Sequence, residues 1–150
     1  MEVINYFESN IQEYWLEEIR KSEWQEGFFL YKLLSMGTFF KTAGEGAKVL
    51  LLTDDKELIS FCTYEKINDI QSKEQTSWVG FVYTFPEYRG HHFAGLLFEK
   101  IEYLAKEDCV SEVYISTNYI GLYEKYGCEY KTQVKEMNGE LSRIYVKRIG

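Results

Sequence analysis

The residues that could best do chemistry lie in segment 81–99, which reads FVYTFPEYRGHHFAGLLFE. An apolar, β-prone stretch ends at Pro86, a short loop with Arg89 and Gly90 follows, and a helical pattern begins after it. The first turn of a helix has N–H groups without intrahelical partners and carries roughly half a positive charge, so such a loop can hold a phosphate or pyrophosphate. The segment therefore predicts an anion-binding loop between a buried strand and a helix.

Two common phosphate-binding motifs do not account for this loop. The sequence contains neither G-x-x-x-x-G-K-[ST] nor G-x-G-x-x-G, so the signatures of P-loop nucleotidases and Rossmann dehydrogenases are missing. A purely structural role stays open, because Gly90, Ala94 and Gly95 could serve only to bring helix and sheet close together. Taken alone, the segment does not decide between a structural turn and an anion site.

A second segment, about thirty residues further along the chain, makes the pattern more specific. Residues 122–128 read LYEKYGC, and residues 89–94 read RGHHFA. Together they resemble the GNAT superfamily of acetyl-CoA-dependent N-acetyltransferases, in which an Arg/Gln-x-x-Gly-x-Gly/Ala loop precedes a Leu-Tyr-Glu-Lys-x-Gly-Phe segment. The chain departs from the family pattern at His92, where glycine is usual, and at Cys128, where phenylalanine is usual. The resemblance covers essentially the whole chain.

The resemblance implies a fold, a cosubstrate and a reaction. It implies a single GNAT domain over residues 1–150, of the α+β class, with a mixed central sheet of about six to seven strands flanked by helices. Acetyl-CoA would donate its acetyl group to a primary amine of a small-molecule or protein acceptor. The alternative is a GNAT-fold module that binds CoA, or nothing, without turnover.

The resemblance also implies roles for particular residues. The exposed edge of the fourth strand would pair with the pantetheine arm, and one of its N–H groups would polarise the thioester carbonyl; the residues concerned are Tyr83, Thr84 and Phe85. The pyrophosphate would rest on the backbone N–H groups of a cradle, which comprises Arg89, Gly90, His91, His92, Phe93, Ala94 and Gly95. Tyr123 matches the family tyrosine that often protonates the departing thiolate.

Two roles in the site remain open. The asparagine that often contacts pantetheine in the family would fall at Ser116, and the asparagine nearest to that place is Asn118, which could instead cap a short helix. An alkylamine has a pKa of about 10.4, so only about one part in a thousand is neutral at pH 7, and a general base is expected. Strand 78–85 contains no acid or histidine, which leaves Glu65, Asp69 or a water relay as candidates.

Hydrophobic periodicity predicts the elements that must position these residues. Residues 4–19 and 24–34 have the spacing of two amphipathic helices, with Ser22 and Gln25 as a capping box for the second. Strands are expected over 48–53, 58–66, 78–85, 112–116, 129–136 and 140–148, with loops over 41–46 and 68–77. A long helix after Gly90 and a short helix over 120–126 complete the order, with Asn138-Gly139 as a hairpin turn between the last two strands.

Composition limits the classes of protein to which the chain can belong. Its 150 residues suit one domain, and 17 Lys and Arg against 24 Asp and Glu give a net charge of −7, which argues against nucleic-acid binding. The acidic surplus modestly favours a cationic amine as acceptor. Dimerisation through the final strands is plausible, so we expect a monomer or a homodimer.

Metal binding and membrane insertion are not expected either. The three cysteines, Cys62, Cys109 and Cys128, have no zinc-site spacing and indicate buried, reduced thiols, while the two histidines are adjacent. No long apolar stretch and no basic leader appears, so the sequence predicts a soluble cytoplasmic protein without a membrane span.

Overall fold

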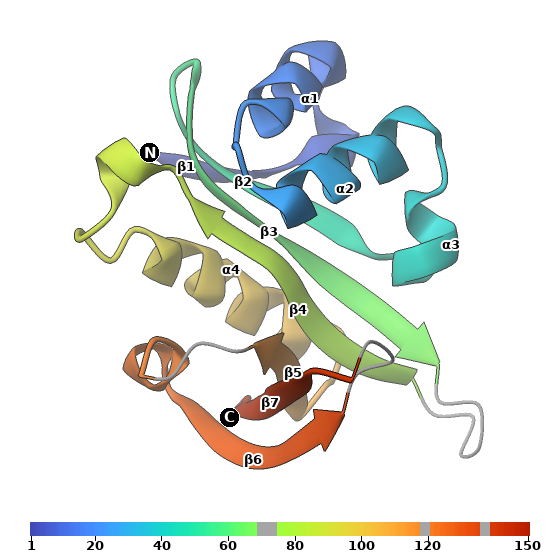
Figure 1. Cartoon of the computed structure of the whole chain (residues 1–150), viewed down its shortest axis with the longest axis vertical. Helices are drawn as coiled ribbons and strands as arrows, with labels where there is room; N and C mark the ends of the chain where they lie inside the picture. The colour runs from blue at the N-terminus through green and yellow to red at the C-terminus, as the bar shows by residue number, and fades with distance from the viewer. Residues whose placement is uncertain (69–74, 118–120, 136–138) are drawn as a thin grey trace.

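One mixed sheet organises the computed structural model, which describes residues 1–68, 75–117, 121–135 and 139–150 (Figure 1). Within the described residues its seven strands lie in the order β1-β2-β3-β4-β5-β7-β6. Their bounds are β1 Glu2–Asn5, β2 Lys48–Asp54, β3 Glu57–Asn68, β4 Gln75–Thr84, β5 Glu112–Thr117, β6 Cys128–Lys135 and β7 Leu141–Arg148. The pair β4/β5 is parallel and every other pair is antiparallel.

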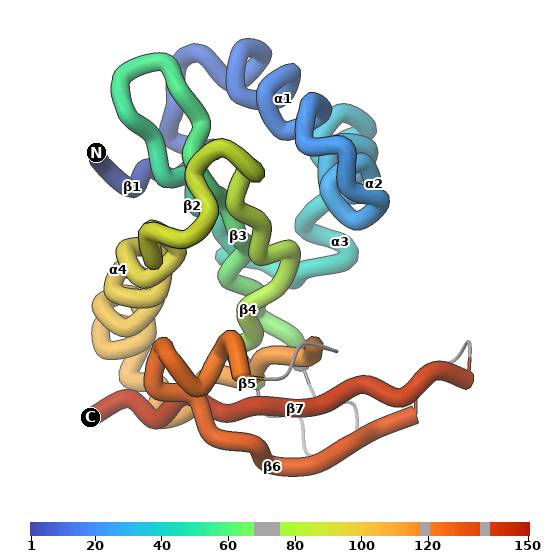
Figure 2. The backbone as a smooth tube through the Cα atoms, turned by 60° about the vertical axis from the view of Figure 1, so that its left-hand side comes forward, coloured from blue at the N-terminus to red at the C-terminus, as the bar shows by residue number. Residues whose placement is uncertain are grey.

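Helices cover both faces of this sheet. Helices α1 (Gln12–Arg20), α2 (Gln25–Ser35) and α3 (Phe39–Ala43) lie on one face, and α4 (Ala94–Glu107) lies on the other (Figures 1 and 2). Strand β2 shows why the sheet is buried on both sides: Val49 and Leu51 join the core under α1 to α3, while Leu50 and Leu52 join the core under α4. Alternate side chains of a strand point to opposite faces, so an unbroken apolar run such as KVLLLT serves two cores.

The α+β class and the mixed, helix-flanked sheet are confirmed, but the N-terminal prediction was wrong. Residues 2–5 form a strand that pairs with β2, followed by a 3-10 turn over Tyr6–Glu8, and α1 begins only at Gln12. The apolar spacing of Ile4 and Phe7 fits a helix, but pairing with the edge of β2 outweighed it.

Several local predictions also need correction. Trp24, not Ser22, occupies the N-cap position of α2, and the buried Ser22 hydroxyl has no hydrogen-bond partner among the described residues. The loop expected over 41–46 is partly helical, because α3 extends to Ala43. Cys109, expected to be buried, is exposed; it follows the end of α4 and has a positive φ of 57°.

The last third of the chain differs from prediction in smaller ways. Of the short helix expected over 120–126, the described residues 121–126 form a 3-10 turn over Tyr123–Tyr126, which ends at Gly127 with a φ of +83°. Asn138 of the expected hairpin turn lies outside the described residues, whereas Gly139 has the left-handed φ that such a turn requires. No helix within the described parts of the chain is long and apolar enough to cross a membrane.

The sheet opens between β4 and β5, and this opening positions the site. The two strands pair only where residues 77–79 meet residues 113–115. Beyond Val79, β4 continues along β3 and β5 continues along β7. At the same place β4 bulges: Thr63 lies opposite Gly80 and Phe61 opposite Tyr83, so two residues of β4 face Cys62 alone. A bulge bends its strand and increases the local twist, which helps to turn β4 away from β5.

Candidate active site

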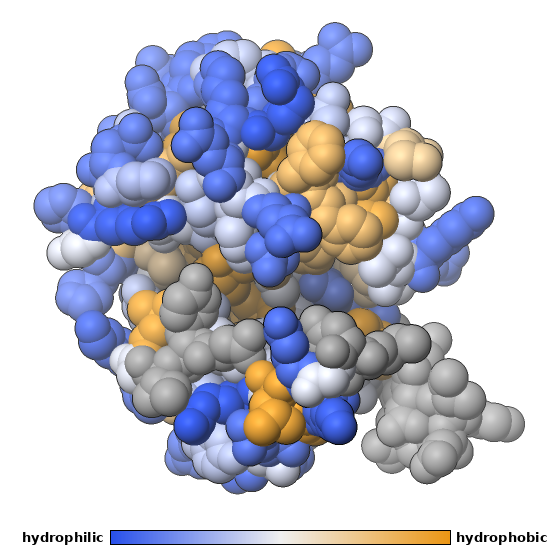
Figure 3. Space-filling view, viewed as in Figure 1, coloured by the Kyte–Doolittle hydropathy of each residue, from blue (hydrophilic) through white to orange (hydrophobic). Residues whose placement is uncertain are grey.

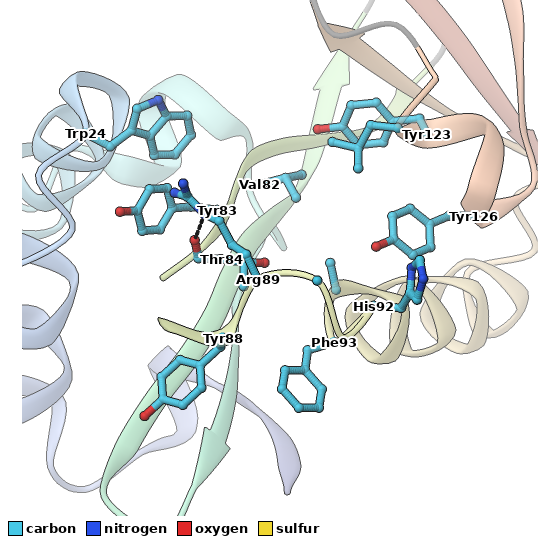
Figure 4. Close-up of a pocket in the computed structure, with 13 residues that line it drawn as sticks. Trp24, Val82, Tyr83, Thr84, Tyr88, Arg89, His92, Phe93, Tyr123 and Tyr126 are labelled. Atoms are coloured by element: carbon cyan, nitrogen blue, oxygen red, sulfur yellow. Dashed lines mark hydrogen bonds between the residues drawn. The ribbon is translucent and has the colours of Figure 1, made fainter. Parts of the chain in front are cut away.

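Two cavities lie along the opening and share Trp24, Val82 and Tyr123. The first, here called the cofactor cavity after the predicted cofactor residues that line it, has a volume of about 390 Å³ (Figure 4). Its other lining residues are Tyr83, Thr84, Tyr88, Arg89, Gly90, His92, Phe93, Ala94, Leu122 and Tyr126. The second, here called the acceptor cavity after the amine acceptor expected from the sequence, has a volume of about 410 Å³. It is further lined by Glu26, Val79, Gly80, Phe81, Ile115, Ser116, Thr117 and Ser142.

The edge of β4 beside the cofactor cavity presents backbone groups. The N–H of Phe85 donates to the carbonyl of Ile59 on β3 at 3.1 Å, so it points away from the opening. Backbone groups alternate in direction along a strand, which turns the N–H and carbonyl of Thr84 toward the opening. Consistent with this, the Thr84 carbonyl accepts a hydrogen bond from Arg89 Nε at 2.8 Å. Of the three residues predicted to line this edge, Thr84 therefore has its N–H on the open side, and that of Phe85 is already engaged.

Val82, which lines both cavities, was missed from the sequence. It lies two residues before Thr84 on the same open edge, directly after Phe81, whose φ of 51° marks the bulge. A glycine inside a strand pattern often accompanies a bulge, so Gly80 was a signal that could have indicated this geometry.

Tyr83 holds one wall of the cofactor cavity. Its ring stacks on Trp24 with centroids 5.2 Å apart, and its hydroxyl donates to the carbonyl of Ser22 at 2.5 Å. The Arg89 guanidinium lies 5.3 Å from the centre of the same ring (Figure 4). Burial raises the pKa of Tyr83 and the nearby Arg89 opposes that shift. Tyr83 thus joins β4 to the start of α2 and keeps Arg89 folded back over the strand.

The predicted cradle has unpaired backbone donors. Within the described residues, no protein acceptor faces the N–H groups of Gly90, His91, His92, Phe93 and Ala94. The N–H of Gly95 donates to the carbonyl of His92 at 3.0 Å, and the N–H of Arg89 donates to the carbonyl of Pro86 at 3.3 Å, so these two predicted contacts are already in use. Helix α4 begins at Ala94 without a side-chain cap. Consecutive free N–H groups at a helix start are a suitable site for a phosphate oxygen.

The two histidines of the cradle lie differently. His92 has a φ of +59°, the left-handed conformation that favours glycine, and its side chain lines the cofactor cavity near Tyr126 (Figure 4). His91 stacks on Phe93 at 5.2 Å and does not line the cavity. The backbone at position 92 therefore keeps a shape suited to glycine although the side chain is an imidazole.

Tyr123 lies where the cofactor and acceptor cavities meet. It begins the 3-10 turn that ends at Gly127, and its ring packs edge-on to Phe98 of α4 at 6.0 Å and near Tyr145 of β7 at 6.2 Å. Figure 4 shows its hydroxyl directed into the opening, on the side of Val82. A buried tyrosine held by two aromatic neighbours can present a proton at a fixed place.

The acceptor cavity combines apolar walls with a few polar groups. Ser116 and Ser142 share a hydrogen bond of 2.6 Å between their hydroxyls, and Glu26 brings a carboxylate from α2. Phe29 of α2 stacks on Phe81 at 6.1 Å, and Figure 3 shows apolar residues exposed over α2 and α3 on this side of the molecule.

The residues proposed for the two open roles are only partly described. Asn118 and Asp69 lie outside the described residues. Ser116 lines the acceptor cavity, and the Glu65 carboxylate of β3 lies next to Gly80, which also lines that cavity. Within the described parts of the chain, no group of three or more His, Cys, Asp or Glu side chains is placed to hold a metal ion.

Comparison with known proteins defines the class. Residues 10–128 match the model of the acetyltransferase (GNAT) family, so the chain belongs to that family. No curated protein sequence matches the chain.

Solved structures with the same fold include three that span nearly the whole chain. A protein from Desulfovibrio desulfuricans, described as an acetyltransferase of the GNAT family, has a TM-score of 0.74 at 14% identity and covers 99% of each chain. Aminoglycoside 6′-acetyltransferase type Ii has a TM-score of 0.73 at 16% identity, covering 100% of this chain and 98% of that one. An aminoglycoside 6′-N-acetyltransferase complexed with coenzyme A has a TM-score of 0.72 at 11% identity, with the same coverage. At these identities the likeness concerns the fold.

Proposed function

We propose that this protein transfers the acetyl group of acetyl-CoA to a primary amine, by direct attack of the amine on the thioester while both substrates are bound. The observation that carries the proposal is the meeting of two cavities at Val82 and Tyr123. One cavity is bordered by free backbone N–H groups, and the other opens toward α2 and β5. Two substrates entering from opposite sides would meet at these shared residues.

The residues of the cofactor cavity fit acetyl-CoA. The free N–H groups from Gly90 to Ala94 would hold its pyrophosphate, with the charge of the α4 N-terminus in support. The open edge of β4 at Val82 and Thr84 would pair with the amide-containing pantetheine arm, as a further strand would. Acetyl-CoA itself supplies an acyl group that a nucleophile can displace from sulfur.

Two groups of the chain would lower the barrier to transfer. An N–H of the open edge, at Val82 or Thr84, would donate to the thioester oxygen as negative charge develops there. Tyr123 would donate its phenolic proton to the departing CoA sulfur. Either Ser116, which lines the acceptor cavity, or Asn118, as the sequence suggests, would contact the pantetheine arm.

The acceptor is proposed to be an amine that is cationic at neutral pH. Glu26 lines the acceptor cavity, Glu65 lies beside it, and the chain carries a net charge of −7. Two of the similar structures are aminoglycoside acetyltransferases, whose acceptors are also amines.

A titration of thermal stability with acetyl-CoA, followed by an assay of CoA thiol release across an amine panel, tests this function. Acetyl-CoA at about 100 times its Kd should stabilise the fold by about 2.7 kcal/mol. Stabilisation together with amine-dependent thiol release supports the enzyme. Stabilisation without release from any amine favours the second candidate, a CoA-binding module, which His92 at a glycine-like position supports. Absence of stabilisation at millimolar acetyl-CoA would exclude both.

A further inference from the structure

A carboxylate from β3 fills the place of a missing side chain on β4. Gly80 lines the acceptor cavity, and a Cβ built there would lie 2.3 Å from Glu65 Oε2 and 3.0 Å from Thr63 Oγ1. Thr63 lies opposite Gly80 in the sheet, and Glu65 lies opposite Trp78. Alternate residues of a strand share a face, so Thr63 and Glu65 both lie on the face covered by α1 to α3. The Glu65 carboxylate thus rests against the Gly80 wall of the acceptor cavity.

The Glu65 carboxylate is held by a hydrogen bond and has no ion pair among the described residues. The Thr63 hydroxyl donates to Glu65 Oε2 at 2.6 Å, and Oε1 has no hydrogen-bond donor among the described residues. A hydrogen bond to one oxygen fixes the orientation of the group and leaves the other oxygen able to accept a proton.

The surroundings of Glu65 make its carboxylate a better proton acceptor than an exposed carboxylate. Burial raises the pKa of its carboxyl, and the Thr63 hydrogen bond opposes the shift. The neighbouring Lys66 is paired with Asp108 beside α4, and Lys48 lies opposite Tyr64, whose ring is in the α4 core, so both lysines belong to the opposite face.

The helices over the Glu65 face bring ionisable groups of their own. Glu26 of α2 and Lys41 of α3 are both exposed, and neither contributes to the shift of Glu65. The Glu65 carboxylate therefore has no cationic partner among the described residues to keep it ionised, which leaves it free to take up a proton.

We propose that Glu65 is the general base of the reaction, which rests on the function proposed above. The ammonium form of the acceptor gives one proton to the Glu65 carboxylate, directly or through one water, and becomes a neutral amine. The amine nitrogen then bonds to the thioester carbon as the carbon–sulfur bond breaks. Tyr123 donates its proton to the sulfur and regains one from the attacking nitrogen, so the products are the amide, CoA thiol and one proton released to solvent from Glu65.

Substitution of Glu65 by glutamine, assayed with two amines, tests this role. One amine should be an ordinary alkylamine, and the other an amine whose ammonium pKa is below 7, so that it needs no base at neutral pH. Glu65→Gln should lower kcat/KM for the alkylamine by about 10²- to 10⁴-fold at pH 7 and have little effect on the weakly basic amine. The residual alkylamine rate should then rise about tenfold per pH unit toward the pKa of the amine, whereas the wild-type rate levels off at lower pH.

Matched variants separate a base from a structural residue. Glu65→Asp keeps a carboxylate and should recover part of the rate, while Asp69→Asn tests the other acidic candidate. Stabilisation by acetyl-CoA should be retained in Glu65→Gln, which shows that the fold and the cofactor cavity are intact. An equal loss with both amines, a loss below about threefold, or the alkylamine-specific loss appearing in Asp69→Asn instead would each overturn the role of Glu65. A wild-type protein that acetylates no amine would overturn the proposed function itself.

Discussion

The cofactor cavity and the acceptor cavity meet at Tyr123, but backbone groups define the first and side chains define the second. The cofactor cavity depends on backbone groups from one stretch of chain, the open edge of β4 and the N–H groups before α4. The acceptor cavity depends on side chains brought by α2, β4, β5 and β7. Backbone donors persist when side chains change, whereas a cavity of side chains changes with each substitution. A fold of this kind can therefore keep one cosubstrate while its acceptor varies.

Of the substitutions that test this difference, Tyr123→Phe should have the largest effect on turnover, because Tyr123 lines both cavities. Loss of the phenolic proton should lower kcat by about 10²- to 10⁴-fold, the range of a general acid. The ring and its contacts with Phe98 and Tyr145 remain, so acetyl-CoA should still stabilise the fold as in the wild type. Steady-state kinetics and thermal titration with acetyl-CoA measure the two quantities separately.

The control for this experiment is Tyr103→Phe. Tyr103 is an exposed tyrosine of α4 outside both cavities, so its substitution should change neither quantity. If Tyr123→Phe loses turnover and acetyl-CoA binding to the same degree, Tyr123 holds the site together and does not supply a proton.

The difference between the two cavities also explains which parts of the site could be predicted from the sequence. Two short motifs, residues 89–94 and residues 122–128, were each recognisable from consecutive residues. The structure brings residues of both motifs to one cavity. The acceptor cavity joins Trp24, Gly80 and Ser142, which no local pattern connects. The bulge that exposes Val82 depends on how β4 pairs with β3, and β1 was mistaken for a helix because pairing with β2 decided its conformation. Predictions failed where contacts between distant strands outweighed local periodicity.

His92→Gly should have a smaller effect, confined to the cofactor cavity. A non-glycine residue in the left-handed region is strained by roughly 1 kcal/mol, and glycine removes that strain although it gains freedom in the unfolded state. We expect a stability gain of up to about 1 kcal/mol in urea unfolding, and acetyl-CoA affinity equal to or above that of the wild type.

His91→Gly is the matched comparison, because His91 does not have a positive φ. It should destabilise the fold by about 0.5–1 kcal/mol, opposite in sign to His92→Gly. Clearly weaker acetyl-CoA binding in His92→Gly would show instead that the imidazole contacts the cosubstrate, and the cradle would then no longer be a purely backbone site.

Glu65→Gln tests the acceptor cavity, because Glu65 lies against Gly80 in its wall. Its effect on the free energy of unfolding should be the smallest of those predicted. Because burial raises the pKa of Glu65 in the folded state, the folded protein binds a proton more readily than the unfolded chain. The stability contributed by this group is present in full below the unfolded pKa of about 4.3 and is lost as pH rises through the raised pKa.

The free energy of unfolding of Glu65→Gln relative to wild type should therefore increase over that pH interval, as measured by urea unfolding at a series of pH values. A difference that is constant with pH would mean that Glu65 ionises as an ordinary surface carboxylate. The half-buried Glu65 has a raised pKa beside the acceptor cavity, whereas the cofactor cradle offers backbone N–H groups that do not titrate. We therefore expect the stronger pH dependence on the acceptor side of Tyr123.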